Sequence, residues 1–471
     1  MTRPTWLERW EPEDPRFWAE TGKRLAWRTL ALTTSSLLLS FATWFMMSAI
    51  VVRLPEIGFR YDTMQLFWLA AIPGLAGGTL RILHTFLIPL FGTRHVITVA
   101  TLLKLLPCVG IGLAVMNPGT PFWLFLVLAF SAGFGGGDFS SHMPSTSLFF
   151  PKRLQGTALG IQAGIGNFGV SLAQFATPWI IGVGVVGSLV GGSQVLQRAG
   201  RTREVWLQSA ALWYVPVLLV VAALCWRFLR NVPVRATFRE QLDIFRDKHT
   251  WFCTVTYMMT FGSFSGLAAS FPLMIRVLYG EFPGAPDPLA YAFLGPLVGS
   301  AVRAAAGWPA DRWGGSILTQ AAGLGLIGCG LALVLGGYLA PTSLDQFPMF
   351  AVLMVGLFFF AGIGNASTFR QYPIIFAHSP RQGAGVLGFS AAIAAYGPFI
   401  FSILIGWSID RTGSAGSFFA GAIAFWVVAS AINWWFYTRP GKQRWDFGTR
   451  WGTWWDASRA AGPARPRDGP R

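Results

Sequence analysis

Twelve stretches of this chain are long and apolar enough to cross a lipid bilayer as an α-helix, which needs about 20 such residues. Inside a bilayer every backbone N–H and C=O must be bonded within the protein, and a helix satisfies its own groups. We therefore predict an all-α membrane protein with twelve transmembrane helices. The predicted spans are residues 29–52, 65–90, 96–116, 121–149, 157–185, 206–226, 250–275, 289–310, 315–339, 347–376, 384–408 and 416–437.

The composition agrees with a chain that is dissolved in lipid. Hydrophobic residues make up 53% of it and charged residues only 12%, whereas soluble proteins carry about 25% charged residues. The net charge of +16 would suggest nucleic-acid binding in a soluble protein. In a membrane protein, an excess of Lys and Arg instead marks the cytoplasmic segments. We expect the lipid bilayer, and no nucleic acid, as a partner.

The distribution of Lys and Arg predicts the topology. These residues gather at both ends of the chain and in the connection after the sixth span, which places both termini in the cytoplasm. The connection 186–205, with three arginines on the external side, is an exception. The expected location is the cell (inner) membrane. The predicted segments are an N-terminal arm (1–28), a first six-helix bundle (29–226), a central linker (227–249), a second six-helix bundle (250–437) and a basic tail (438–471).

The two sets of six spans repeat each other. Leu75–Arg81 (LAGGTLR) corresponds to Leu297–Arg303 (LVGSAVR), and at the same offset Gly92 corresponds to Gly314. Two such halves, related by a pseudo-axis along the membrane normal, are typical of transporters with a substrate site between the halves near the midplane. The repeat makes Arg81 and Arg303 equivalent residues that should face each other.

Of all the residues, Arg81 and Arg303 give the strongest indication of function. A guanidinium at the centre of a transmembrane helix costs about 3 kcal/mol by insertion scales. Two planar forks of N–H donors at one site suit a small planar oxyanion, and Arg stays charged at physiological pH. The alternative is that a buried acid neutralises each arginine. Asp138 is the one carboxylate that lies clearly within a predicted span.

Two amides raise a similar question. Asn167 lies in a glycine-rich stretch of the fifth span, and Asn365 lies in the tenth. Glycines in such spans are explained by close helix packing. Packing does not explain a mid-membrane amide, which needs hydrogen-bond partners. Both residues are therefore candidates for substrate binding.

Several motifs resemble those of one family. They are Thr79–Arg81 (TLR), Phe149–Lys152 (FFPK), Ala163–Gln174 (AGIGNFGVSLAQ), Tyr257–Phe264 (YMMTFGSF), Phe293–Arg303 (FLGPLVGSAVR), Gly307–Gly315 (GWPADRWGG) and Gly362–Phe369 (GIGNASTF). With these motifs the chain resembles the nitrate/nitrite porter family of the major facilitator superfamily, particularly the bacterial nitrate/nitrite antiporters, over about residues 10–440.

The resemblance implies a major facilitator fold in which Arg81 and Arg303 grip nitrate or nitrite. It also implies that Phe139, Tyr257 and Phe261 wall the site, and that Asn167 belongs to the substrate signature of the fifth span.

The chain departs from the family pattern at two titratable residues. Asp138 stands where the family usually has Asn, and His84 stands where it has an aromatic residue. Either could carry a proton. Asp138 could instead pair with an arginine, and Lys104 in the third span could pair or reach toward the membrane surface.

These residues support one main hypothesis and one alternative. The first is uptake of nitrate in exchange for nitrite by alternating access, because a site with two bare positive charges crosses the membrane more readily when it is loaded. The alternative is proton-coupled transport of nitrate or nitrite through Asp138 or His84.

Other classes fit the sequence less well. An enzyme is not expected, because the chain has no HExxH motif, no clustered His and Cys ligands and no Ser-His-Asp pattern. A channel is disfavoured by the two-fold repeat with a single midplane site. We therefore expect no catalytic residues, no cofactor, no metal and a monomer.

Overall fold

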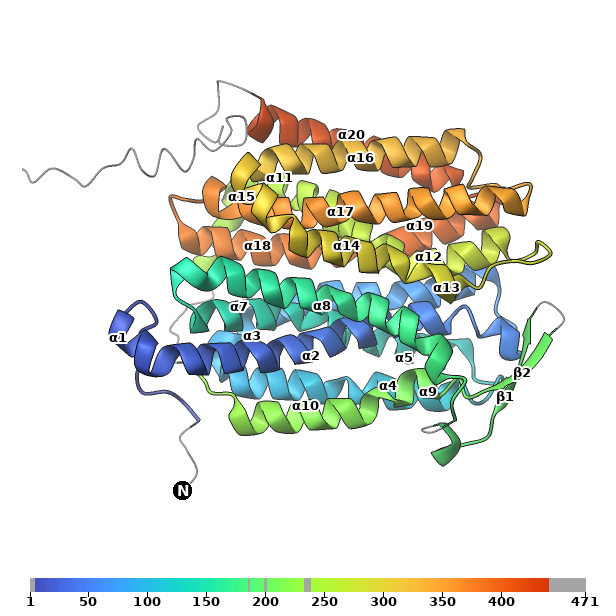
Figure 1. Cartoon of the computed structure of the whole chain (residues 1–471), viewed down its shortest axis with the longest axis horizontal. Helices are drawn as coiled ribbons and strands as arrows, with labels where there is room; N and C mark the ends of the chain where they lie inside the picture. Colours follow the sequence, from blue (N-terminus) through green and yellow to red (C-terminus); the bar gives the residue numbers. More distant parts are fainter. Residues whose placement is uncertain (1–4, 185–186, 199–200, 233–238, 440–471) are drawn as a thin grey trace, which may run out of the picture.

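The computed structural model describes residues 5–184, 187–198, 201–232 and 239–439. It is an elongated bundle of helices that run lengthwise beside one another (Figure 1). The N-terminal helix and the end of α20 lie at one end of the bundle, here called the terminal end. A β hairpin marks the opposite end, here called the hairpin end.

The helices and strands before residue 229 form one set, here called the N half. Their bounds are α1 (Pro15–Phe17), η1 (Trp18–Gly22), α2 (Lys23–Ile50), η2 (Pro55–Ile57), α3 (Thr63–Leu103), α4 (Leu105–Ala114), α5 (Phe122–Ser131), α6 (Phe134–Gly137), α7 (Phe139–Phe149), α8 (Lys152–Ile180), η3 (Gly187–Leu189), β1 (Gln194–Arg198), β2 (Arg201–Val205), α9 (Ser209–Leu212) and α10 (Tyr214–Phe228).

The remaining helices form the C half. Their bounds are η4 (Arg239–Arg246), α11 (Lys248–Tyr257), η5 (Met258–Gly262), α12 (Ser263–Tyr279), α13 (Pro288–Ala292), α14 (Leu294–Ala305), α15 (Gly307–Trp313), α16 (Gly315–Leu335), η6 (Leu344–Gln346), α17 (Phe347–Ile375), α18 (Pro380–Ala394), α19 (Gly397–Thr412), α20 (Gly416–Asn433) and η7 (Trp434–Thr438).

Ten helical segments within the described ranges are long and apolar enough to cross a membrane. The other two predicted spans correspond to α8 and to the α13–α14 segment, which carry more polar residues. The prediction of an all-α membrane protein is thus confirmed, and the count of twelve agrees with this structure.

Short interruptions of regular α-helix occur within several of the predicted spans. The third is interrupted at Lys104, the fourth at Gly133 and Asp138, and the eighth at Phe293. The eleventh is broken at Ala395 and Tyr396. Such breaks are tolerated in lipid only where neighbouring helices satisfy the freed backbone groups, so they mark places where helices pack closely.

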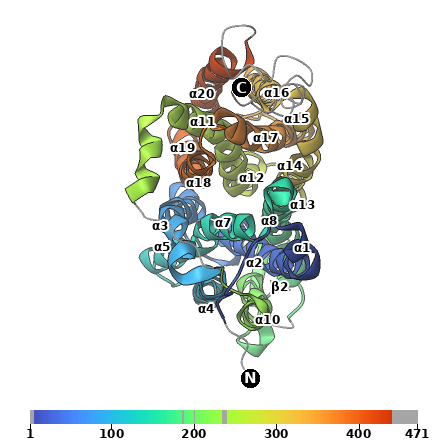
Figure 2. The same cartoon turned by 90° about the vertical axis from the view of Figure 1, so that its left-hand side faces the viewer.

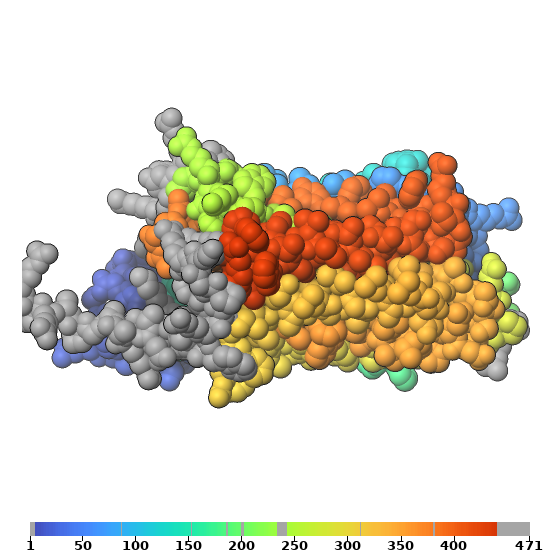
Figure 3. Space-filling view, turned by 90° about the horizontal axis from the view of Figure 1, so that it is seen from above, coloured from blue at the N-terminus to red at the C-terminus, as the bar shows by residue number. Residues whose placement is uncertain are grey.

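The bundle divides into its two halves when it is viewed from the terminal end (Figure 2). The N half lies below and the C half above, with α8 and α3 next to the C half. Helix α8 packs against α14, and α3 packs against α19. On the outer surface of the C half, α20 and α16 lie side by side along the length of the bundle (Figure 3).

The sequence repeat has a clear structural counterpart at its two glycines. Gly92 has φ 78° and Gly314 has φ 94°, so both have a left-handed backbone conformation that favours glycine. Asn231, from the chain after α10, packs on Gly92, and its side-chain oxygen accepts a hydrogen bond of 2.8 Å from the backbone N–H of Arg94. Each half therefore turns sharply after the helix that carries its arginine.

Ion pairs between the halves close the hairpin end. Arg53 of the N half lies 2.6 Å from Asp287 of the C half, and Arg198 of strand β1 also contacts Asp287 at 2.5 Å. Arg276 of the C half contacts Glu56 of the N half at 3.1 Å. Within the connection 186–205, strands β1 and β2 pair antiparallel, and Arg198 of β1 links them to Asp287 of the other half.

The charge of Asp287 is held in place at ordinary pH. Burial alone would raise the pKa of Asp287, but the guanidinium groups of Arg53 and Arg198 outweigh burial and hold that pKa below its usual value. The ion pairs are therefore fully formed above the usual pKa of Asp and weaken only as the pH falls through the lower pKa of the closed form.

The structure describes the predicted arm, linker and tail only in part. Residues 1–4 of the arm, residues 233–238 of the linker and residues 440–471 of the basic tail lie outside the described residues.

Gly92→Ala should destabilise the protein, because a Cβ at residue 92 would lie 2.4 Å from the Asn231 side chain. The backbone of Gly92 (φ 78°, ψ 160°) is also in a region that costs a non-glycine residue about 1–3 kcal/mol. Gly156→Ala in α8 is the control, because its Cβ would meet no atom within 4 Å. We expect a lower melting temperature in detergent for the first variant alone. Equal melting temperatures would contradict this reading of Gly92.

Asp287→Asn should loosen the hairpin end, because it removes the carboxylate that two arginines share across the halves. The measurement is the distance between spin labels at residues 60 and 342, in a background without the four native cysteines. We expect a shift to longer distances. Asp345→Asn, which changes an exposed aspartate at the same end, should leave the distances unchanged. An unaltered distribution in Asp287→Asn would argue against an ion-pair closure.

Candidate anion-binding site

Arg81 lies inside the bundle with its side chain fully buried. Its Nε donates to the carbonyl oxygen of Gly136 at 2.8 Å, and its Nη1 donates to the carbonyl oxygen of Ala391 at 2.8 Å. Gly136 belongs to α6 of the N half and Ala391 to α18 of the C half. The guanidinium of Arg81 therefore lies where the two halves meet, and backbone carbonyls hold it without neutralising it.

Arg303 is the counterpart on α14, and it is 6% exposed. Its guanidinium lies 5.1 Å from the ring centre of Phe369 and 6.0 Å from that of Phe261. The Arg81 guanidinium lies 5.4 Å from the same Phe261 ring. The two arginines thus share one aromatic wall, and they are close enough for their charges to interact.

The predicted aromatic residues surround this pair. The Phe139 ring lies 4.5 Å from the Arg81 guanidinium. Tyr257 and Phe261 are stacked with an angle of 6° between their rings, and Tyr257 also stacks on Phe369 at 4.8 Å. An aromatic face attracts a cation through its quadrupole. The rings therefore stabilise the guanidinium groups and leave their N–H groups available.

The site gathers polar atoms that the protein does not satisfy. Among the described residues, no hydrogen-bond partner of good geometry is found for Arg81 Nη2, Arg303 Nη1 or either side-chain polar atom of Asn167 and Asn365. All of these atoms are buried, and the Tyr257 hydroxyl interacts with the Arg303 side chain. Buried polar groups in proteins are nearly always bonded, so these N–H donors and amide oxygens favour a polar ligand.

Helix packing brings Asn167 and Asn365 to the same region. Gly164 of α8 faces Ala304 of α14, directly after Arg303 in the chain, and Asn167 lies one turn further along α8. Gly362 of α17 packs on Gly299 of α14. One turn further along these two parallel helices come Asn365 and Arg303. The glycines therefore let α8 and α17 pack closely on α14, the helix that carries Arg303, with each amide one turn beyond a contact glycine.

Asp138 and His84 have partners other than the arginines. Asp138 forms an ion pair with Lys104, with 2.7 Å between Nζ and Oδ2, and both side chains are fully buried. The His84 Nδ1 hydrogen bonds to the Ser141 hydroxyl at 2.8 Å. The suggestion that Asp138 pairs with an arginine is wrong for this structure, because Lys104 is its ion-pair partner.

The sequence reasoning missed two aromatic residues and two backbone carbonyl groups, those of Gly136 and Ala391. Trp44 lies 5.3 Å from the Arg81 guanidinium, and Phe369 and the Ala391 carbonyl are described above. Phe369 ends a motif that was singled out, Gly362–Phe369, so its neighbourhood gave a signal. Trp44 and Ala391 gave none, because aromatic residues are abundant and a carbonyl has no sequence signature.

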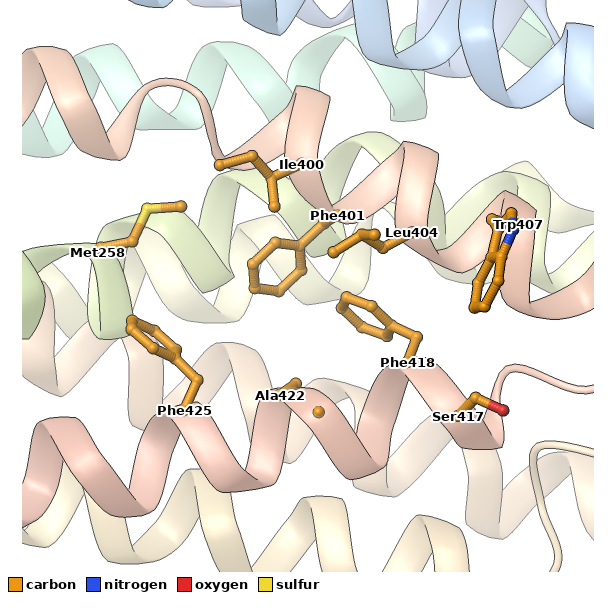
Figure 4. Close-up of a pocket in the computed structure, with 10 residues that line it drawn as sticks. Met258, Ile400, Phe401, Leu404, Trp407, Ser417, Phe418, Ala422 and Phe425 are labelled. Carbon is orange, nitrogen blue, oxygen red and sulfur yellow. The ribbon is translucent and has the colours of Figure 1, made fainter.

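A cavity of about 450 Å3 lies elsewhere in the C half, between α19 and α20 (Figure 4). Phe401, Phe418 and Phe425 project into it, and Met258 of η5 lies at one end. Its lining includes one hydroxyl, that of Ser417, and no charged side chain. Trp407 and Leu404 are half exposed there. An anion would lose its hydration without compensation in this cavity, so we place the anion site at the arginines.

Known proteins resemble this chain along almost its whole length. The sequence profile of the Major Facilitator Superfamily matches residues 32–373. The "Probable nitrate/nitrite antiporter NarK2" of Thermus thermophilus is 58% identical over 441 residues, which cover 93% of this chain and 98% of that protein. The "Nitrate/nitrite transporter NarU" of Escherichia coli strain K12 is 36% identical over 455 residues, covering 92% and 96% respectively.

A solved structure supports the fold alone. It is a bacterial homologue of the human lysosomal transporter Spinster, described as inward-facing and occupied, with a TM-score of 0.61 and 15% sequence identity. The match covers 86% of this chain and 95% of that one. The fold, the profile match and the two relatives agree with the family that the motifs indicated. This chain is a multi-pass membrane protein that belongs to the nitrate/nitrite porter family of the major facilitator superfamily.

Proposed function

We propose that this protein carries nitrate across the cell (inner) membrane in exchange for nitrite. The observation that carries the proposal is the pair Arg81 and Arg303, two buried guanidinium groups with unbonded N–H donors that both lie near the Phe261 ring. Planar donor forks match the edges of a flat oxyanion. The relatives described above are named for nitrate and nitrite, which supports the same ligands here.

The surrounding residues have distinct proposed roles. Phe139, Tyr257 and Phe261 cover the faces of the flat anion. Asn167 and Asn365 supply amide donors to its oxygens. A strongly hydrated anion gains little from aromatic faces and would be excluded. No step of this transport makes or breaks a covalent bond, so we propose no catalytic residue, cofactor or metal.

Exchange follows from the charge of the site. Arg81 is held by two neutral carbonyl groups, and Asp138 is occupied by Lys104. The unloaded site therefore keeps two positive charges in a medium of low dielectric constant, which disfavours its passage across the membrane. A bound anion reduces that charge, so the loaded carrier changes conformation more easily. The same contacts of Asp138 and His84 remove the main motivation for proton coupling.

The transport cycle is alternating access by rocking of residues 29–226 against residues 250–437, as one carrier per chain. We place the terminal end in the cytoplasm and the hairpin end outside, in line with the distribution of Lys and Arg. In this orientation the ion pairs of Arg53, Arg198 and Arg276 close the external side. Opening of that side requires these pairs to separate.

The direct test uses purified protein in vesicles that are loaded with nitrite. External nitrate should accelerate nitrite release, and the release should saturate with the nitrate concentration. External sulfate at the same ionic strength is the control and should not accelerate release. If nitrate has no effect, the exchange proposal is wrong. A lumen that becomes more acidic during nitrate entry would favour proton coupling instead.

The arginine pair can be tested by Arg81→Lys and Arg303→Lys. Lysine keeps the charge but loses the planar fork. Each lost charge-assisted hydrogen bond is worth about 1.5–3 kcal/mol, so we expect roughly a 10- to 100-fold lower kcat/KM for nitrate. Arg411→Lys, which changes an exposed arginine near the hairpin end, should behave as the unchanged protein. Wild-type transport by either site variant would contradict the proposed site.

A further inference from the structure

A second pair of buried charges, Lys104 and Asp138, lies in the N half close to the anion site. Lys104, between α3 and α4, forms an ion pair with Asp138, between α6 and α7, and neither side chain is exposed to solvent. The hydroxyl of Ser40 donates to the same carboxylate oxygen at 2.8 Å. The Nδ1 of His142 lies 3.8 Å from the other oxygen. This group lies entirely within the N half.

Asp138 is directly connected to the contacts that hold Arg81. Gly136, whose carbonyl accepts from Arg81 Nε, precedes Asp138 by two residues. Phe139, whose ring lies 4.5 Å from the Arg81 guanidinium, follows it. Asp138 also occupies the point at which the fourth span is interrupted, between α6 and α7. A displacement of Asp138 would therefore also displace Gly136 and Phe139, two of the residues that the N half presents to Arg81.

The charge of Asp138 matters to the anion as well. Asp138 interacts electrostatically with Arg81. An ionised, unpaired carboxylate at this place would compete with a bound anion for the positive charge of Arg81. Lys104 cancels that negative charge at a distance of 2.7 Å. Breaking a buried pair by removing one partner is far more harmful than replacing both partners with neutral groups.

We propose that Lys104 is a positioning residue of the anion site: by pairing with Asp138 it fixes the break that presents Gly136 and Phe139 to Arg81, and it keeps the Asp138 charge from competing with the anion. The claim that the Asp138 charge would compete with the anion rests on the proposed function. The claim that the ion pair fixes the position of Gly136 and Phe139 does not. Under this proposal Asp138 takes no part in proton transport as long as Lys104 is present.

Other titratable groups lie near this ion pair, and the experiment must distinguish their effects on pH dependence from that of the pair. They are His142 on α7, His84 on α3, Cys108 on α4 and Cys225 on α10. The element α2 contributes the hydroxyls of Ser36 and Ser40. A variant that neutralises both members of the pair leaves all of these groups in place, so it shows what they contribute on their own.

The experiment compares Lys104→Met, Asp138→Asn and the double variant Lys104→Met/Asp138→Asn with the unchanged protein. The KM for external nitrate is measured in nitrite-loaded vesicles between about pH 5.5 and pH 8, with equal pH on both sides. A buried carboxylate without its cation is protonated at low pH and charged at high pH.

In Lys104→Met the KM should therefore rise with pH, by about tenfold across this range. The unchanged protein and the double variant should show little dependence on pH. A purely structural role of Lys104 would lower activity without creating this dependence.

Melting curves in detergent without any anion provide a readout that is independent of transport. Lys104→Met should lose melting temperature as the pH rises, because the folded state loses the proton of Asp138 and is left with a buried unpaired charge. Asp138→Asn should also be destabilised, because the buried Lys104 is left without its carboxylate. The double variant should recover most of the loss. If the unchanged protein exchanges no nitrate, the proposed function fails while these curves still test the ion pair.

Two results would overturn the proposal. One is a Lys104→Met variant with the KM and melting temperature of the unchanged protein at every pH. The other is a double variant that is no better than Lys104→Met, or that fails to fold as well. Folding of the double variant where Lys104→Met alone fails to fold would support the proposal, because a neutral pair then replaces the ionic one.

Discussion

The structure around the site depends on the burial of two like charges close together inside the helix bundle. Each guanidinium carries an insertion cost of about 3 kcal/mol in the middle of a helix, and the two repel each other. The protein offsets this with carbonyl oxygens and aromatic faces, which bind a cation and remain neutral. Carboxylates would have stabilised the arginines better. They would also have cancelled the charge that an anion needs, so neutral partners leave the site able to bind.

This choice of partners explains much of the architecture around the site. The carbonyl oxygens of Gly136 and Ala391, which accept from Arg81, both lie within four residues of a break in their span. The Ala391 oxygen also accepts from the backbone N–H of Ala395 at 3.2 Å, so both of its lone pairs are used. Glycines of α8, α14 and α17 let the neighbouring helices approach closely.

The amino-acid sequence predicted the features that stand out against an apolar background. Arg81, Arg303, Asn167 and Asn365 were identified because a polar group in a membrane span is expensive, and the repeat linked the arginines. The aromatic wall came only from the family resemblance, because the chain has 40 phenylalanines and 22 tryptophans. The pairing of Lys104 with Asp138 could not be predicted. It depends on the rotation of two separate spans about their axes, and apolar periodicity defines such rotation poorly when all faces of a helix are apolar.

The two halves of the site are unlike in one respect, although the arginines are equivalent by repeat. Phe261 lies in η5, a π-helical turn within the seventh span, whereas its repeat partner, the first span, is the continuous α-helix α2. A π-helical turn accommodates one more residue than an α-helical turn. The Phe261 ring, which lies 5.4 Å from the Arg81 guanidinium and 6.0 Å from the Arg303 guanidinium, belongs to the C half together with Arg303. If the halves separate, this ring stays with Arg303 and leaves Arg81.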